Sequence, residues 1–206
     1  MTPATPFVLT GPSGTLVAQG IRNSYDDVAA AGAALRDGSA GLVVGALPFD
    51  PRDPAALLAP ERVAHTLPPA PDSPLPKVRV AAALPDVATH RARVEAALHR
   101  LRDPENPLRK VVLARSLQLA ADGPLDPLAI LHRLVDADPE SFAYLADLSP
   151  AGPAHTGTAL VGASPELLVA RRGEEVTCRP FAGSAPRSAD PRADDAAGAA
   201  LAASAK

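Results

Sequence analysis

Proline limits what this chain can fold into more than any other residue, because it cannot continue the interior of a helix or a central strand. Nine of the 24 prolines lie in the stretch 48–76, so we expect no long helix or strand there. The same stretch holds Phe49, Leu57, Leu58 and Val63, which gives it apolar side chains to pack. We therefore predict an ordered surface connection rather than a linker between domains.

Aliphatic side chains must build the core of this protein. Hydrophobic residues make up 47% of the chain, yet aromatic residues account for only 3% and Trp is absent. The interior therefore has to be filled by Ala, Val and Leu. A single Cys excludes an internal disulfide and a Cys-based zinc site, and it is typical of a reducing compartment.

The charge and hydropathy of the chain exclude two classes of partner. A formal net charge of −3 argues against nucleic acid, because phosphate binding needs a basic surface. No segment approaches the roughly 18 consecutive apolar residues of a membrane helix, and the first residues lack the features of a signal peptide. We therefore expect a cytoplasmic protein that acts on a small molecule, with no nucleic acid and no membrane as partner.

Hairpins and helices alternate irregularly along the chain. Residues 7–10 and 15–18 predict two strands joined by a Gly-Pro-Ser-Gly turn. Further strands are predicted at 41–47, 77–80, 111–119, 142–148, 159–163, 167–170 and 176–178. Without regular βαβ alternation, this order indicates an α+β protein with largely antiparallel sheets packed against helices.

Four helices are predicted, three of them from their capping residues. Ser24 and Asp27 resemble a capping box for a helix that ends at Gly38. Asp86 can cap a helix to Arg102, and Asp126 can cap one to about residue 135. An alanine-rich helix follows residue 187. The helix after Asp86 carries one apolar stripe, formed by Val87, Val94, Leu98 and Leu101.

Most of the polar residues have ordinary structural interpretations. The five His residues are scattered without the spacing of metal ligands, and His90 and His99 are predicted to be surface residues. Cys178 falls in a strand pattern and is predicted to be a small core residue. Asp194 and Asp195 are predicted to lie on a solvated helix face.

Three segments favour a functional interpretation. Lys110 precedes the strand predicted at 111–119 and projects on its more polar side, with Val112, Ala114, Ser116 and Gln118. Glu166 lies in a tight turn between two apolar runs, where it is either a turn-capping group or a proton donor. Gly183 and Ser184 offer backbone N–H groups that can hold a carboxylate.

Taken together and in this order, the three segments resemble the chorismate-utilising enzymes and, within them, the isochorismate synthases. The matching stretches are KVVLAR at 110–115, GASPELLV at 162–169 and PFAGSAPR at 180–187, with weaker matches at 7–20, 44–51, 60–63 and 201–206. The resemblance covers the whole chain but only the N-terminal half of a typical member. It implies a single incomplete chorismate-binding domain over 1–206, with the N-terminal part of the fold of anthranilate synthase component I.

The resemblance also implies a role for each candidate residue. Lys110 matches the general base that activates water for attack at C2 of chorismate, and Glu166 matches the acid that protonates the departing C4 hydroxyl. Gly183 and Ser184 match contacts to the bound substrate. Family members bind Mg²⁺ through glutamates that would follow Lys206, so we expect no metal ligand within this chain.

Three functional alternatives follow from the resemblance. Lys110 argues against anthranilate synthase, which tends to carry Gln there and uses ammonia. The AGSAPR stretch is more similar to isochorismate synthases of 2,3-dihydroxybenzoate siderophore pathways than to salicylate synthases or menaquinone-pathway enzymes. Salicylate synthase remains an alternative, as does a non-catalytic remnant or subunit that needs a partner supplying the C-terminal half. Such a half sheet would expose apolar surface and open strand edges.

Overall fold

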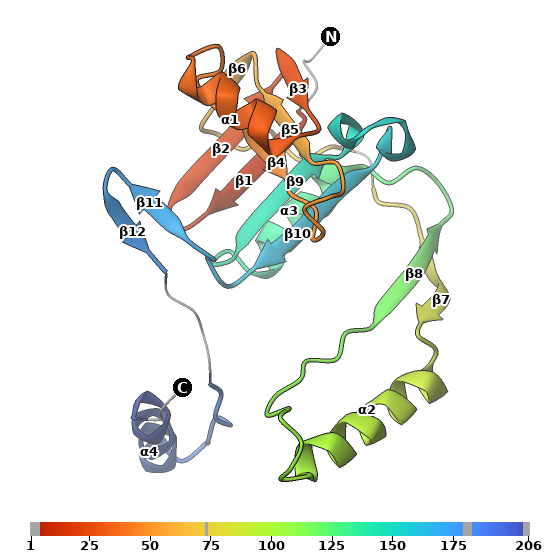
Figure 1. The fold of residues 1–206 in the computed structure, drawn as a ribbon, viewed down its shortest axis with the longest axis vertical. Coiled ribbons are helices and arrows are strands. Elements are labelled where there is room, and N and C mark those ends of the chain that lie inside the picture. Colours follow the sequence, from red (N-terminus) through yellow and green to blue (C-terminus); the bar gives the residue numbers. More distant parts are fainter. Residues whose placement is uncertain (1–4, 73, 179–182, 204–206) are drawn as a thin grey trace. The chain divides into compact units, whose positions relative to one another are not determined.

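The computed structural model describes residues 5–72, 74–178 and 183–203 (Figure 1). Contacts divide the chain into two compact units. The first consists of Met1–Pro69 and Leu131–Lys206, and the second of Ala70–Ile130. Every strand pairing among the described residues is antiparallel, which confirms the α+β prediction. That the whole chain forms one domain stays a prediction.

A five-stranded sheet with the order β10-β9-β1-β2-β6 forms the centre of the first unit. Its strands are β1 (Phe7–Gly11), β2 (Gly14–Gln19), β6 (Arg62–Ala64), β9 (Phe142–Asp147) and β10 (Ala159–Ser164). β1 and β2 form the predicted hairpin, in which Gly11 pairs with Gly14 across the turn. β9 pairs with β1 on one side and with β10 on the other. The sheet therefore connects β10, and the Glu166 turn that follows it, to the N-terminal hairpin through β9.

The stretch 48–76 contains a buried strand, so its prediction as a surface connection is wrong. A second sheet has the order β3-β5-β4, with β3 (Asn23–Tyr25), β4 (Val44–Ala46) and β5 (Ala56–Ala59). β5 is the central strand and all four of its residues are buried. Proline spacing explains this result, because the interval between Pro54 and Pro60 is long enough for a four-residue strand with every N–H group intact.

The core is aliphatic, as predicted. The buried hydrophobic residues of the described chain are all Ala, Val or Leu. One part of this core lies between helix α1 (Val28–Arg36) and β5, where Tyr25 and Val43 pack against two clusters of small buried side chains. These clusters are Ala31, Ala55 and Leu57, and Ala34, Ala40 and Ala59.

Each α-helix of the described chain begins next to an aspartate that accepts a backbone N–H bond. Asp86 caps α2 (Val87–Arg102) and Asp126 accepts from the Leu128 amide at the start of α3 (Pro127–Ala137), as predicted. Asp190 caps α4 (Pro191–Ala202). The predicted Ser24 cap of α1 is wrong: Asp27 is the N-cap, because Ser24 belongs to β3 and pairs with β5.

The second unit holds α2 and a two-stranded ribbon of β7 (Val78–Leu84) and β8 (Ser116–Ala121). The strand predicted at 111–119 is therefore wrong over its first part, since residues 111–115 are not in a strand. A strand needs a neighbour for its backbone N–H and C=O groups. Among the described residues, β7 pairs with residues 116–121. The strand β8 is therefore limited to these residues.

One face of the β7–β8 ribbon is apolar and exposed. Val80 pairs with Leu119, and beyond a bulge Ala83 pairs with Leu117, so these side chains share a face. Val80 is 61% exposed, Leu117 56% and Leu119 55%. No residue of α2 is buried either, so the apolar stripe predicted on it is not covered. The exposed apolar surface expected of a half sheet is present.

The remaining elements follow β9 in the sequence. Two 3₁₀ turns, η1 (Ser149–Ala151) and η2 (Pro153–His155), lie between β9 and β10. β11 (Ala170–Arg172) and β12 (Glu175–Thr177) then form a short hairpin turned at Gly173. Cys178 is exposed just after β12, so its prediction as a core residue is wrong.

Candidate functional site

Lys110 lies in the second unit, in an irregular segment ahead of β8. Local hydrogen bonds order the loop between α2 and this segment: the Leu108 amide donates to the Asn106 side chain at 2.9 Å, and the Arg109 guanidinium donates to the Asn106 carbonyl. Lys110 itself is exposed. The predicted alternation of faces does not apply to it, because 110–115 is not a strand.

Glu166 is held in a tight turn at the end of β10. The Ser164 hydroxyl accepts a hydrogen bond from the Glu166 amide at 3.2 Å and donates one to the Glu166 carbonyl at 3.0 Å. Glu166 is half-buried. Two residues before Ser164, the ring of Tyr144 on β9 fills the space that a Cβ would need at Gly162. The GASPE stretch is therefore fixed both by the sheet and by its own turn.

A cleft of about 490 Å³ lies beside this turn. Its lining comes from the start of β9, from the residues on either side of Glu166 and from the β11–β12 hairpin: Phe142, Pro165, Leu167, Ala170, Arg172, Glu175 and Thr177. Glu166 itself is not part of the lining. The lining is mainly apolar, with one guanidinium and one carboxylate.

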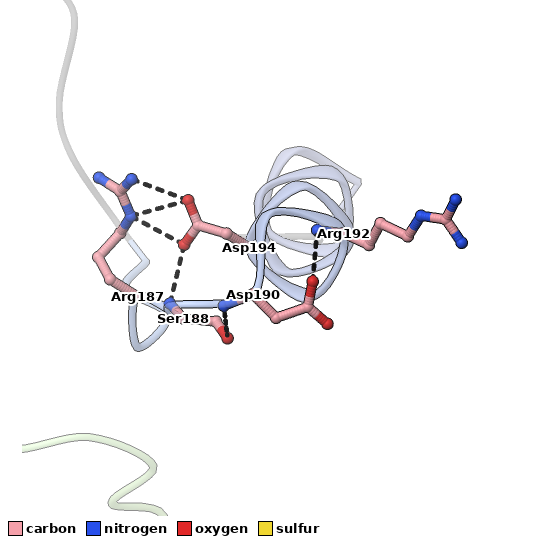
Figure 2. Close-up of polar contacts among 5 residues, drawn as sticks. All are labelled: Arg187, Ser188, Asp190, Arg192 and Asp194. Atoms are coloured by element: carbon pink, nitrogen blue, oxygen red, sulfur yellow. Dashed lines mark hydrogen bonds and ion pairs between the residues drawn. The ribbon is translucent and has the colours of Figure 1, made fainter.

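Gly183 and Ser184 are both exposed, in an irregular segment that leads to α4. Residues 180–182 of the same motif lie outside the described residues. Arg187, at the end of the motif, donates from Nε to both carboxylate oxygens of Asp194, at 2.8 and 3.0 Å (Figure 2). The Arg187 guanidinium and the Ser188 amide hold the pKa of Asp194 below its usual value.

Asp194 is the residue that the sequence analysis missed. It was expected on a solvated helix face, whereas its side chain is only 22% exposed and is bonded to Arg187. Asp195, its neighbour, is exposed as predicted. One signal in the sequence is present: a carboxylate in the first turn of a helix that Asp190-Pro191 begins, with an Arg shortly before it.

The described residues do not form a metal site. No group of three or more His, Cys, Asp or Glu side chains among them is placed to hold a metal ion. These residues therefore do not by themselves fit Mg²⁺. That the ligands of Mg²⁺ follow Lys206 stays a prediction, and Lys206 lies outside the described part.

The structure fixes each candidate residue within its own unit. Lys110 belongs to the second unit, and Glu166, Gly183 and Ser184 to the first. The roles of base and acid on one substrate require Lys110 and Glu166 to face a common cleft, and this is a prediction. Among the described helices, none has the length and apolar character needed to cross a membrane.

Comparison with known proteins places these features in a family. Residues 55–206 match the family model "Chorismate binding enzyme". "Putative isochorismate synthase MenF" of Mycobacterium tuberculosis is 59% identical over 206 residues, covering 99% of this chain and 55% of the relative. Isochorismate synthase DhbC of Bacillus subtilis is 36% identical over 170 residues, covering 80% of this chain and 42% of the relative.

A solved structure agrees with these matches. The crystal structure of the "putative 2,3-dihydroxybenzoate-specific isochorismate synthase, DhbC from Bacillus anthracis" aligns with a TM-score of 0.70 and 29% identity, covering 97% of this chain and 54% of that one. The resemblance and the fold expected from the sequence are confirmed. The chain spans about half the length of the relatives it matches, and it belongs to the chorismate-binding enzyme family.

Proposed function

We propose that this chain supplies the acid–base part of an isochorismate synthase, which converts chorismate to isochorismate. The observation that carries the proposal is the match of almost the whole chain, at 59% identity, to a relative named for this activity. We place the protein in the cytoplasm, and the proposed substrate is chorismate.

The proposed chemistry divides proton transfer between two side chains. Lys110 takes a proton from the water that attacks C2 of chorismate, and Glu166 gives a proton to the C4 hydroxyl, which leaves as water. One water is consumed and one released, so the reaction is an isomerisation. The two Ser164 bonds hold the main chain of Glu166. They support its proposed role, because a general acid needs a fixed position from which its carboxyl group can reach the atom it protonates.

Substrate binding is assigned to Gly183 and Ser184. Their exposure leaves the segment accessible to a substrate carboxylate, which backbone N–H groups bind well. Mg²⁺ is the proposed cofactor, and its ligands would come from outside this chain.

The apolar face of the β7–β8 ribbon supports a requirement for further polypeptide. An isolated two-stranded ribbon is marginally stable in water, and this one exposes Val80, Leu117 and Leu119. We propose that the part of the family's length which this chain does not span covers this face, either in the same polypeptide or in a partner.

The test compares two proteins. One is the 206-residue chain; the other, called here the completed protein, is the M. tuberculosis relative with its matching 55% replaced by this chain. Each is incubated with chorismate and Mg²⁺, and the products are separated by chromatography. We expect isochorismate from the completed protein, its loss on chelation of Mg²⁺, and no product from the 206-residue chain.

Three outcomes would contradict the proposal. Salicylate and pyruvate as final products would identify a salicylate synthase. A folded completed protein that makes neither product would favour a non-catalytic role. Mg²⁺-dependent turnover by the 206-residue chain, with its intact mass confirmed, would show that no further polypeptide is needed.

A further inference from the structure

The segment 183–188 runs back along α4 and contacts it at two places. At its start, a Cβ on Gly183 would lie 2.7 Å from Leu201 Cδ1, so the Gly183 backbone lies against the last turn of the helix. At its end, Arg187 and Ser188 bond to Asp194 in the first turn. The segment that carries the proposed substrate contacts is thus fixed to one helix at both ends.

Asp194 makes most of the polar contacts between the segment and the helix. Its carboxylate accepts two hydrogen bonds from Arg187 Nε and forms an ion pair with Arg187 Nη2 at 2.8 Å (Figure 2). It also accepts a hydrogen bond from the Ser188 amide at 3.0 Å. Charge-assisted bonds to a planar guanidinium fix direction as well as distance. Asp194 therefore holds both the side chain and the backbone at the end of the segment.

Capping of α4 does not account for these contacts. Asp190 is the N-cap and accepts from the Arg192 amide at 3.1 Å, while the Asp190 amide donates to the Ser188 hydroxyl. The orphan N–H group of Arg192 at the helix start is thus satisfied by Asp190. The Asp194 carboxylate is instead directed to residues that precede the helix.

We infer that Asp194 is a positioning residue, which acts through Arg187 and Ser188 to hold the Gly183–Ser184 backbone in the arrangement that binds the substrate carboxylate. The inference rests on the proposed function, because it assigns Asp194 a purpose at that site. Ordering the segment before substrate arrives removes an entropy cost from binding. Loss of Asp194 should therefore weaken binding more than it slows the chemical step.

The test uses Asp194→Ala with Asp195→Ala as its matched control. Both substitutions remove one carboxylate from the same helix, and Ala is the strongest helix former, so α4 should persist in both. Amide hydrogen exchange in the 206-residue chain is the first readout. We expect Asp194→Ala to speed exchange about tenfold or more at the Ser188 amide, which is bonded to Asp194, with the amides in the middle of α4 unchanged. At Gly183 and Ser184, whose backbone is exposed, we expect lower NMR order parameters for the backbone N–H groups.

The second readout is the kinetics of the completed protein. We expect Asp194→Ala to raise KM for chorismate about tenfold with little change in kcat, the pattern of lost uniform binding. Asp195→Ala should leave both constants unchanged, and Asp194→Glu should recover part of the lost affinity.

Either readout can overturn the inference. Unchanged exchange at Ser188 together with unchanged order parameters at Gly183 and Ser184 in Asp194→Ala, or equal changes in Asp195→Ala, would make Asp194 no more than a surface ion pair. A kcat loss without a KM change would also contradict it. If the completed protein makes no isochorismate, the proposed function fails, and the exchange readout decides separately whether Asp194 orders the segment.

Discussion

Ser164 fixes the backbone of Glu166 through two hydrogen bonds, one from the Glu166 amide and one to the Glu166 carbonyl. Ser164 is itself the last residue of β10 and pairs with Phe142 on β9. The Ser164 side chain thus links the backbone of the proposed acid to the last residue of a strand of the five-stranded sheet. The proposed mechanism makes this hydroxyl necessary for the orientation of Glu166.

Replacing Ser164 should therefore slow the reaction of the completed protein. Ser164→Ala removes both bonds, and we expect kcat to fall about 10- to 100-fold, because small misplacements of a reacting group are costly. Ser164→Thr keeps the hydroxyl and is the control, with kcat expected near wild type. Steady-state kinetics measure both. Wild-type kcat in Ser164→Ala would show that the turn does not position Glu166.

Gly45 is required by the close approach of β4 to β5. It has φ +145°, and a Cβ there would collide with the Ala56 carbonyl. Because the colliding atoms are backbone, they cannot rotate away, and we expect Gly45→Ala to destabilise the chain by more than about 2 kcal/mol. Gly41→Ala is the control, since nothing lies within 4 Å of its Cβ position. Urea unfolding that gives equal midpoints for the two variants would contradict this packing.

Leu119 tests whether the apolar face of the ribbon is covered in a longer protein. In the 206-residue chain its side chain is largely exposed, so Leu119→Ala should change the free energy of unfolding by no more than about 0.5 kcal/mol. In the completed protein the same substitution should cost about 2–5 kcal/mol, as for a buried Leu. Thermal or urea unfolding of wild type and Leu119→Ala, each in the 206-residue chain and in the completed protein, measures the two changes. A small effect in both contexts would mean that the face stays open.

The Asp194–Arg187 pair should persist at any pH above the usual titration range of a carboxyl group. Bonds from Arg187 and Ser188 lower the pKa of Asp194 from its ordinary value of 3.8. A folded-state pKa below the unfolded value contributes stability above 3.8, and that contribution is lost as the pH falls through the lowered folded pKa. We expect the carboxyl carbon resonance of Asp194 to titrate below the ordinary value of 3.8. Titration of Asp194 at or above 3.8 would contradict the pair.

Local hydrogen bonding explains what could be predicted from the sequence. The caps at Asp86 and Asp126 involve amides two or three residues away, and the β1–β2 turn needs only its own glycines. Such features are encoded within a few residues and were predicted correctly. The Ser24 cap was wrong because β3 pairs Ser24 with Leu58, a partner that no local pattern reveals.

Long-range partners explain what could not be predicted. Burial of β5 depends on β3 and β4, which lie on its two sides. The proline content of 48–76 gives no sign of these partners. Residues 111–115 alternate as a strand does, yet β7 pairs with residues 116–121 and not with them. Asp194 depends on a side chain seven residues away, and helix periodicity alone assigns it to solvent.

The central claim is that Lys110 and Glu166 act as base and acid. The most direct measurement is the rate of isochorismate formation by Lys110→Ala and Glu166→Gln in the completed protein, together with melting temperature and chorismate binding. Lys77→Ala and Glu174→Gln, which change exposed residues of the same types, are the controls. We predict that the first two variants fold, bind chorismate and lose about 10²–10⁴-fold in rate, while the controls keep theirs. A Lys110→Ala or Glu166→Gln protein that melts early but keeps near-normal turnover at low temperature would make that residue structural and contradict the claim.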